Sequence, residues 1–163
     1  FLKDNSVLTK IIEAMPTNNN QLIEIGPGLG DLTKRLLVKR SVVAYEIDTK
    51  LCIYLNSTFD TEIKNNHFKL NCGDVLNIWE DQGSLWKSEY DLIANLPYYV
   101  ATNIILKAFS DPLCQNIMVM VQKEVALKFS AIPKEKTFSA LGVLTQTVGF
   151  GHIVFDVPPT AFE

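Results

Sequence analysis

The sequence has 163 residues, of which 47% are hydrophobic and 20% are charged. This balance suits one compact domain and excludes an intrinsically disordered chain. No apolar run is long enough for a transmembrane helix, and the first residues lack a signal-peptide pattern. The net charge of −3 and the pI of about 5.4 argue weakly against nucleic-acid binding, because domains that bind nucleic acids are usually basic. Since the chain lacks an initial Met and ends abruptly at Glu163, we expect a fragment.

The cysteines and histidines favour neither a disulfide framework nor a metal centre. Cys52, Cys72 and Cys114 are widely spaced and odd in number, which predicts buried, reduced thiols in a cytoplasmic protein. His67 and His152 stand far apart, with no acidic residue or cysteine at ligand spacing. We therefore expect no bound metal.

Hydrophobic periodicity predicts short strands that alternate with helices. The first helix would be capped by Asn5 or Ser6, and the others follow Gly30 and include Leu51–Leu55, 101–109, 123–130 and 139–147. The predicted strands are 22–25, 42–47, 68–72, 91–94, 117–121 and 152–157. This order implies a mostly parallel sheet with helices on both faces, which binds ligands outside the carboxyl ends of its strands.

A glycine loop opens the helix after the first strand. Gly26, Gly28 and Gly30 let backbone amides approach a ligand closely and allow positive φ. NAD, FAD and S-adenosylmethionine enzymes all use such loops, and a tight turn without any ligand is the alternative. Asp31, however, stands where the dinucleotide fingerprint has glycine. Its carboxylate would repel a pyrophosphate, and it suits a ligand with an amino group and a sulfonium.

Two acidic residues follow the second and third strands. Glu46 stands 20 positions after Gly26, where a carboxylate can accept hydrogen bonds from both ribose hydroxyls. Asp48 lies close to this position in the sequence, so which of the two residues would bind the ribose is left open. Asp74 could accept the adenine amino group of a cofactor, although Gly-Asp is also common turn chemistry.

The segment Asn95-Leu96-Pro97-Tyr98 follows the fourth strand and carries the most specific chemistry. An adenine amino group can donate its two hydrogens to the Asn95 side-chain carbonyl and the Leu96 main-chain carbonyl, in a frame fixed by Pro97. Tyr98 offers a face on which an extruded base can stack. The alternative is a polar turn with two tyrosines that pack locally.

Asn-Leu-Pro-Tyr resembles the fourth motif of the adenine-N6 methyltransferases, specifically the ribosomal RNA dimethyladenosine transferases. Phe1-Leu2 is similar to the end of that family's N-terminal motif. Further matches follow in the family's order at 24–30, 45–48, 73–75, 122–126 and 157–162. Leu rather than Ile after the motif Asn favours the branch that dimethylates small-subunit ribosomal RNA.

The resemblance implies an α/β, Rossmann-like class I methyltransferase fold, with residues 1–163 as the catalytic domain. It implies contacts to S-adenosylmethionine from Leu2, Gly26, Gly28, Glu46, Asp74 and Asn95. It assigns the target base to Asn95, Leu96, Pro97 and Tyr98, with Phe162 against its other face. The implied partner is ribosomal RNA in the immature small subunit, and the implied full-length protein is a cytoplasmic monomer.

The family's C-terminal helical domain and last sheet strand are expected beyond Glu163. Without that strand, we expect the segment after about Gly149 to be displaced, poorly ordered or paired with another chain, and Phe162 to be mispositioned. The alternatives are an adenine-N6 methyltransferase acting on large-subunit ribosomal RNA and a non-catalytic, RNA-binding ribosome assembly factor. A nicotinamide oxidoreductase is disfavoured by Asp31 and by the glycine spacing.

Overall fold

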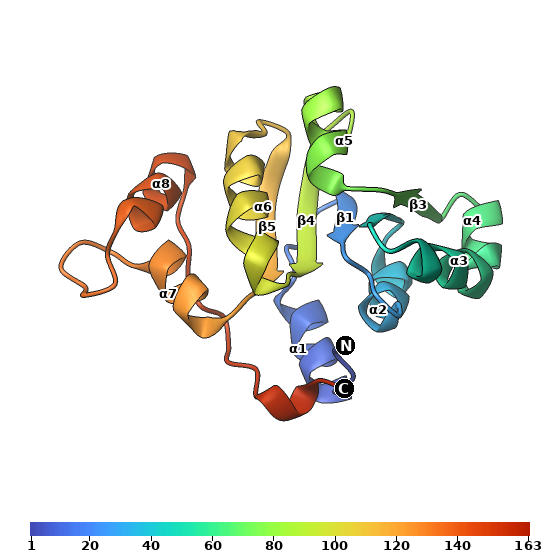
Figure 1. Ribbon diagram of the computed structural model, residues 1–163, viewed down its shortest axis with the longest axis horizontal. Coiled ribbons are helices and arrows are strands. Elements are labelled where there is room, and N and C mark those ends of the chain that lie inside the picture. The colour runs from blue at the N-terminus through green and yellow to red at the C-terminus, as the bar shows by residue number, and fades with distance from the viewer.

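A computed structural model describes residues 1–163 and contains one five-stranded sheet in the order β3-β2-β1-β4-β5 (Figure 1). All four strand pairings are parallel. The strands are β1 (Gln21–Ile25), β2 (Val42–Glu46), β3 (Phe68–Cys72), β4 (Tyr90–Asn95) and β5 (Cys114–Met120). The predicted fold class is confirmed, and the strand order reverses between β1 and β4.

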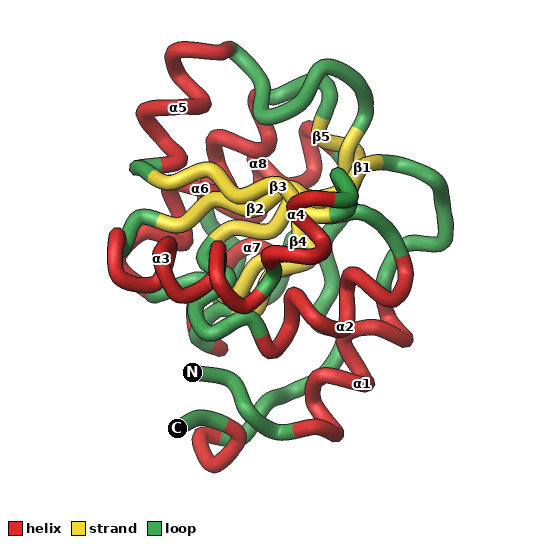
Figure 2. Tube along the Cα trace, turned by 90° about the vertical axis from the view of Figure 1, so that its right-hand side faces the viewer, coloured by secondary structure: helices red, strands yellow, loops and turns green.

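Helices cover both faces of the sheet, as Figures 1 and 2 show. They are α1 (Asn5–Ala14), α2 (Asp31–Lys39), α3 (Thr49–Thr58), α4 (Asp60–Lys64), α5 (Val75–Gln82), α6 (Tyr98–Ser110), α7 (Lys123–Ser130) and α8 (Ala140–Val148). The periodicity did not predict α4 or α5. The cap of α1 is Asp4, whose carboxylate accepts the Ser6 and Val7 amides, so the expected caps Asn5 and Ser6 were wrong.

Alternating strand residues divide the core into two clusters, because successive side chains point to opposite faces of a sheet. Ile23 and Ile25 of β1 belong to the cluster under α5 and α6, together with Trp79. Leu22 of the same strand belongs to the cluster under α1, α2 and α3. The central strands β1, β2 and β4 are therefore buried on both sides, which explains their mostly apolar sequences.

The predicted sixth strand, 152–157, is wrong. Residues 149–158 have no regular secondary structure, and the short 3₁₀ helix Pro159–Ala161 follows them. In Figure 1 this segment runs from α8, which lies beside the sheet, to the N-terminus. An isolated antiparallel bridge joins Leu2 to Phe162, and the Ala161 carbonyl accepts the Lys3 and Asp4 amides at 3.0 and 3.3 Å. The end of the chain is thus bonded to its beginning and adds no strand to the sheet.

The expectation of reduced thiols is also wrong for two of the three cysteines. The structure joins Cys52 of α3 to Cys72 of β3 as a disulfide, with a Cα–Cα distance of 6.2 Å. Cys114 is a free thiol, and its burial raises its pKa to about 12. The widely spaced cysteines gave no sign of this pair, because it depends on how α3 packs beside β3.

None of the helices has the length and apolar character to cross a membrane. The structure also contains no group of three or more His, Cys, Asp or Glu side chains placed to bind a metal ion.

One buried carboxylate joins the elements at the amino ends of β4 and β5. Asp111 is 4% exposed, and its Oδ2 accepts hydrogen bonds from three donors. These are Trp79 Nε1 at 2.9 Å, Ser84 Oγ at 2.9 Å and Tyr90 Oη at 2.6 Å. Trp79 and Tyr90 are fully buried, so neither could find water in place of the carboxylate. Asp111 therefore holds α5 and β4 together.

Replacing Asp111→Ala should destabilise the fold by about 3 kcal/mol, because two buried donors lose their acceptor. For a chain of this size the thermal midpoint should fall by about 6–12 °C, measured by circular dichroism. The matched control is Asp60→Ala, which removes an exposed ion pair with Lys64 and should cost less than about 1 kcal/mol. Equal stabilities of the two variants would contradict this role for Asp111.

Candidate active site

The glycine loop lies at the carboxyl end of β1, and three of its residues have positive φ. The φ angles of Gly26, Gly28 and Gly30 are 70°, 59° and 84°, a region that other residues adopt only with strain. A Cβ on Gly30 would lie 2.6 Å from the Phe59 ring, and one on Gly28 would lie 2.8 Å from the Phe1 ring. Glycine is therefore required here by backbone conformation and by close packing.

Glu46 ends β2 and holds the glycine loop in place. Its side chain is 5% exposed, and its two carboxylate oxygens accept the amide of Gly28 at 3.2 Å and that of Asp48 at 3.0 Å. Each oxygen keeps lone-pair capacity for a further donor. The carboxylate of Asp48, in contrast, caps α3 through the Lys50 and Leu51 amides. Of the two acidic residues, Glu46 is thus the one turned toward the glycine loop.

The backbone places Asp74 next to Glu46. Glu46 is opposite Cys72 in the β2–β3 register, and its main-chain oxygen accepts the Gly73 amide at 2.8 Å. Asp74 is half-buried and caps α5 with one oxygen, which accepts the Leu76 amide at 2.9 Å. The turn chemistry considered for Asp74 is therefore present, and its other carboxylate oxygen is left for another partner.

On the other side of β1, the register sets Asn95 beside Gly26. Ile25 pairs with Ala94, and a Cβ on Gly26 would lie 3.8 Å from the Asn95 main-chain oxygen. Leu96 is buried, and its amide donates to Met120 of β5 at 3.0 Å. The predicted cofactor residues Gly26, Glu46 and Asp74 and the predicted catalytic residue Asn95 therefore share one edge of the sheet.

Pro97 is the N-cap of α6, which begins three residues earlier than the sequence predicted. The carbonyl of Pro97 accepts the Val100 and Ala101 amides at 3.2 and 3.1 Å. This cap leaves Tyr98 on the first turn with 66% of its surface exposed. A ring in this position is free to stack on a planar ligand.

The structure does not pair Phe162 with Tyr98. The Tyr98 ring makes an edge contact with Tyr99 at 6.0 Å, whereas Phe162 is opposite Leu2 in the antiparallel bridge. Leu2 itself is 6% exposed and belongs to the core. Phe1, which the sequence did not assign to the site, has its ring against Gly28.

Glu24 is a second buried carboxylate beside the glycine loop, and it was not among the predicted site residues. It lies on β1, is 1% exposed, and accepts a hydrogen bond from Thr33 Oγ1 of α2 at 2.7 Å. Burial raises the pKa of Glu24 to about 7, and the charge of Glu46 adds to this effect against the opposing Thr33 hydrogen bond. This hydrogen bond thus joins β1, which precedes the glycine loop, to α2, which follows it. The position of Glu24 in the motif match at 24–30 and its place between buried apolar residues of β1 were the available signals.

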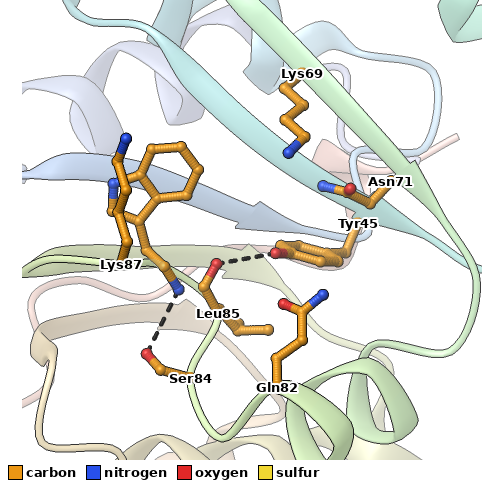
Figure 3. Close-up of a pocket in the computed structure, with 8 residues that line it drawn as sticks. Tyr45, Lys69, Asn71, Gln82, Ser84, Leu85 and Lys87 are labelled. Carbon is orange, nitrogen blue, oxygen red and sulfur yellow. Dashed lines mark hydrogen bonds between the residues drawn. The ribbon is translucent and has the colours of Figure 1, made fainter.

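A pocket of about 280 Å³ lies apart from these residues (Figure 3). Its walls come from β2, β3 and the segment at the end of α5, where Tyr45 Oη donates to the Leu85 carbonyl at 3.0 Å. Two lysines, Lys69 and Lys87, line it together with Trp86. None of the predicted site residues lines this pocket, so it is not the candidate active site.

Backbone amides and side-chain hydrogen-bond acceptors lie together at the carboxyl edge of the sheet. Glu46, Asp74 and Asn95 offer carboxylate and amide oxygens, and no cysteine, serine or histidine among the assigned residues could act as a nucleophile. Acceptors in this arrangement suit a ligand rich in hydroxyl and amino donors, such as a nucleoside. The residues therefore fit S-adenosylmethionine better than they fit a pyrophosphate.

Comparison with known proteins gives close relatives over the whole chain. The chain is 58% identical over 163 residues to ribosomal RNA small subunit methyltransferase A of Sulfurimonas denitrificans and 54% identical over 164 residues to that of Aliarcobacter butzleri. The alignments cover 100% of this chain and 60% and 62% of those proteins. The chain thus spans about 60% of the length of these relatives.

Solved structures have the same fold. A dimethyladenosine transferase from Plasmodium falciparum superposes with a TM-score of 0.74 at 27% identity, over 90% of this chain and 52% of that one. The 23S rRNA methyltransferase ErmE has a TM-score of 0.70 at 23% identity, over 80% of this chain and 51% of that one, and it supports the fold alone.

A family model described as ribosomal RNA adenine dimethylase matches residues 1–163, which includes every motif at the carboxyl edge of the sheet. The chain belongs to the ribosomal RNA adenine dimethylase family.

Proposed function

We propose that residues 1–163 are the catalytic domain of an enzyme that transfers methyl groups from S-adenosylmethionine to N6 of adenines in small-subunit ribosomal RNA. The observation that carries this proposal is the position of Asn95-Leu96-Pro97-Tyr98 beside the Gly26 turn, within one edge of the sheet. The names of the relatives favour the small subunit over the large one. The substrate is the immature small subunit in the cytoplasm, where two methyl groups are placed on each target adenine.

The cofactor would be held by the acceptors on both sides of the glycine loop. The Gly28 and Asp48 amides already hold the Glu46 carboxylate in one orientation. Its side chain therefore need not be ordered further when a ligand binds to the remaining lone pairs. These lone pairs would accept the ribose hydroxyls, and the free oxygen of Asp74 would accept the adenine amino group. When bound, the cofactor supplies a sulfonium methyl group that an amine nitrogen can attack in line.

The target base would be held by the segment that follows β4. The Asn95 side-chain carbonyl and the Leu96 main-chain carbonyl would accept the two N6 hydrogens, which frees the nitrogen lone pair from the ring. Tyr98, exposed on the first turn of α6, would stack on the base. Catalysis then rests on positioning and on polarisation by fixed acceptors, with no covalent enzyme intermediate.

Phe162 has a less direct place in this proposal. We propose that it packs against the base from the side opposite Tyr98, which requires it to leave its bridge with Leu2. The C-terminal portion of the full-length protein would supply the strand that repositions it and the surface that holds RNA. The full-length protein acts as a monomer.

The first prediction concerns cofactor choice. S-adenosylmethionine, or its demethylated product, should bind the protein that contains this chain, whereas NADH should not, because Asp31 opposes a pyrophosphate at the start of α2. Isothermal titration calorimetry with each ligand checks this expectation. Binding of NADH without any response to S-adenosylmethionine would overturn the proposal.

The second prediction concerns Asn95. Asn95→Ala should lower methyl transfer to immature small subunits by about 10²-fold or more, the scale expected when one preorganised polar group is removed from a transition state. Transfer of a radiolabelled methyl group, followed by mapping of the modified base, measures this loss. Asn65→Ala, at an exposed position before β3, is the matched control and should keep full activity.

Near-normal turnover by Asn95→Ala would contradict the role of Asn95. Absence of methyl transfer by the unaltered full-length protein, with RNA binding retained, would favour the non-catalytic assembly factor instead.

A further inference from the structure

The Cys52–Cys72 disulfide stands directly beside the residue that we assign to the cofactor ribose. Cys72 is the last residue of β3 and is opposite Glu46 in the sheet. Cys52 lies in the first half of α3, with its Sγ 3.5 Å from the main-chain oxygen of Glu46. That same oxygen accepts the Gly73 amide at 2.8 Å. The disulfide therefore connects α3, which follows β2, to the carboxyl end of β3.

The two cysteines differ in accessibility. Cys72 is exposed, whereas Cys52 is only 5% exposed. A thiolate from solution can therefore attack at Cys72, which leaves Cys52 as the departing thiolate. Oxidation and reduction can thus proceed without unfolding of α3.

We propose that Cys52 and Cys72 form a reversible thiol–disulfide site that controls the geometry of the ribose-binding edge. In the oxidising direction, the two thiols lose two protons and two electrons to a low-molecular-weight disulfide, which becomes two thiols. In the reducing direction, one small thiolate forms a mixed disulfide with Cys72, and a second resolves it. The link to cofactor binding rests on the proposed function, whereas the redox chemistry does not.

The expected effect on binding follows from preorganisation. The disulfide joins α3 to β3 and so restrains residues 47–48 and 73–74, which carry the Asp48 amide and the Asp74 carboxylate. After reduction, the Cys52 thiol can donate to the Glu46 main-chain oxygen in competition with the Gly73 amide. A site that is already ordered loses less entropy when a ligand binds. The oxidised protein should therefore bind the cofactor more tightly.

The redox chemistry is tested on the full-length protein in buffers with different ratios of oxidised to reduced glutathione. After alkylation, peptide mass mapping counts the modified cysteines. Cys52 and Cys72 should become protected together as the buffer becomes oxidising, and both should become reactive when it is reduced again. Cys114 should show no such paired change, so it serves as the internal control. Independent alkylation of Cys52 and Cys72 at every ratio would overturn the proposal.

The coupling is tested by calorimetry with the demethylated cofactor product. We expect the oxidised protein to bind it at least about threefold more tightly than the reduced protein, within the usual range of coupling between sites. Cys72→Ser should bind like the reduced protein in both buffers, and Cys114→Ser should keep the difference. Because coupling is reciprocal, a tenfold difference in affinity corresponds to a shift of about 30 mV in the disulfide midpoint when ligand is present.

Equal affinities and an unchanged midpoint would overturn control of the cofactor site. Failure of the product to bind either form would overturn the proposed function, while the alkylation result would still decide whether the redox site exists.

Discussion

Parallel pairing of β1 with both β2 and β4 is the constraint on which the candidate site depends. Parallel strands bring their carboxyl ends to one edge, so segments distant in sequence must meet there. Gly26 thereby comes beside the Asn95 main chain, and Glu46 beside Gly73. Since helices bury both faces of the sheet, this edge is where polar groups remain available to a ligand.

Glu46 connects this framework to the proposed chemistry. Its carboxylate accepts two amides from different loops, and its main-chain oxygen accepts a third amide, that of Gly73. Burial raises the pKa of Glu24, and the nearby charge of Glu46 adds to this effect. Two buried carboxyl groups therefore flank the glycine loop, and burial places the pKa of Glu24 near 7. Glu46 accepts two amides through its carboxylate, whereas Glu24 accepts one hydroxyl, that of Thr33.

Local patterns predicted the parts of the fold whose stability is local in origin. The five parallel strands and most helices follow from apolar runs and periodicity, and the site motifs follow from residue type at fixed spacing. The segment 152–157 has the composition of a strand, but it is irregular in the structure, and the residues that follow it are bonded to the N-terminus. In the same way, α5 was not predicted because its short apolar pattern is stabilised by packing of Trp79 against the sheet and by Asp111.

The sequence by itself determined the family resemblance, the fold class and the residues assigned to cofactor and base. These depend on short motifs whose chemistry is set by neighbouring residues. Only the tertiary structure decided that Phe162 pairs with Leu2 and that Cys52 meets Cys72. It also decided that Glu46 rather than Asp48 faces the glycine loop. These are contacts between segments far apart in the chain or choices between near neighbours, and packing of whole elements determines both.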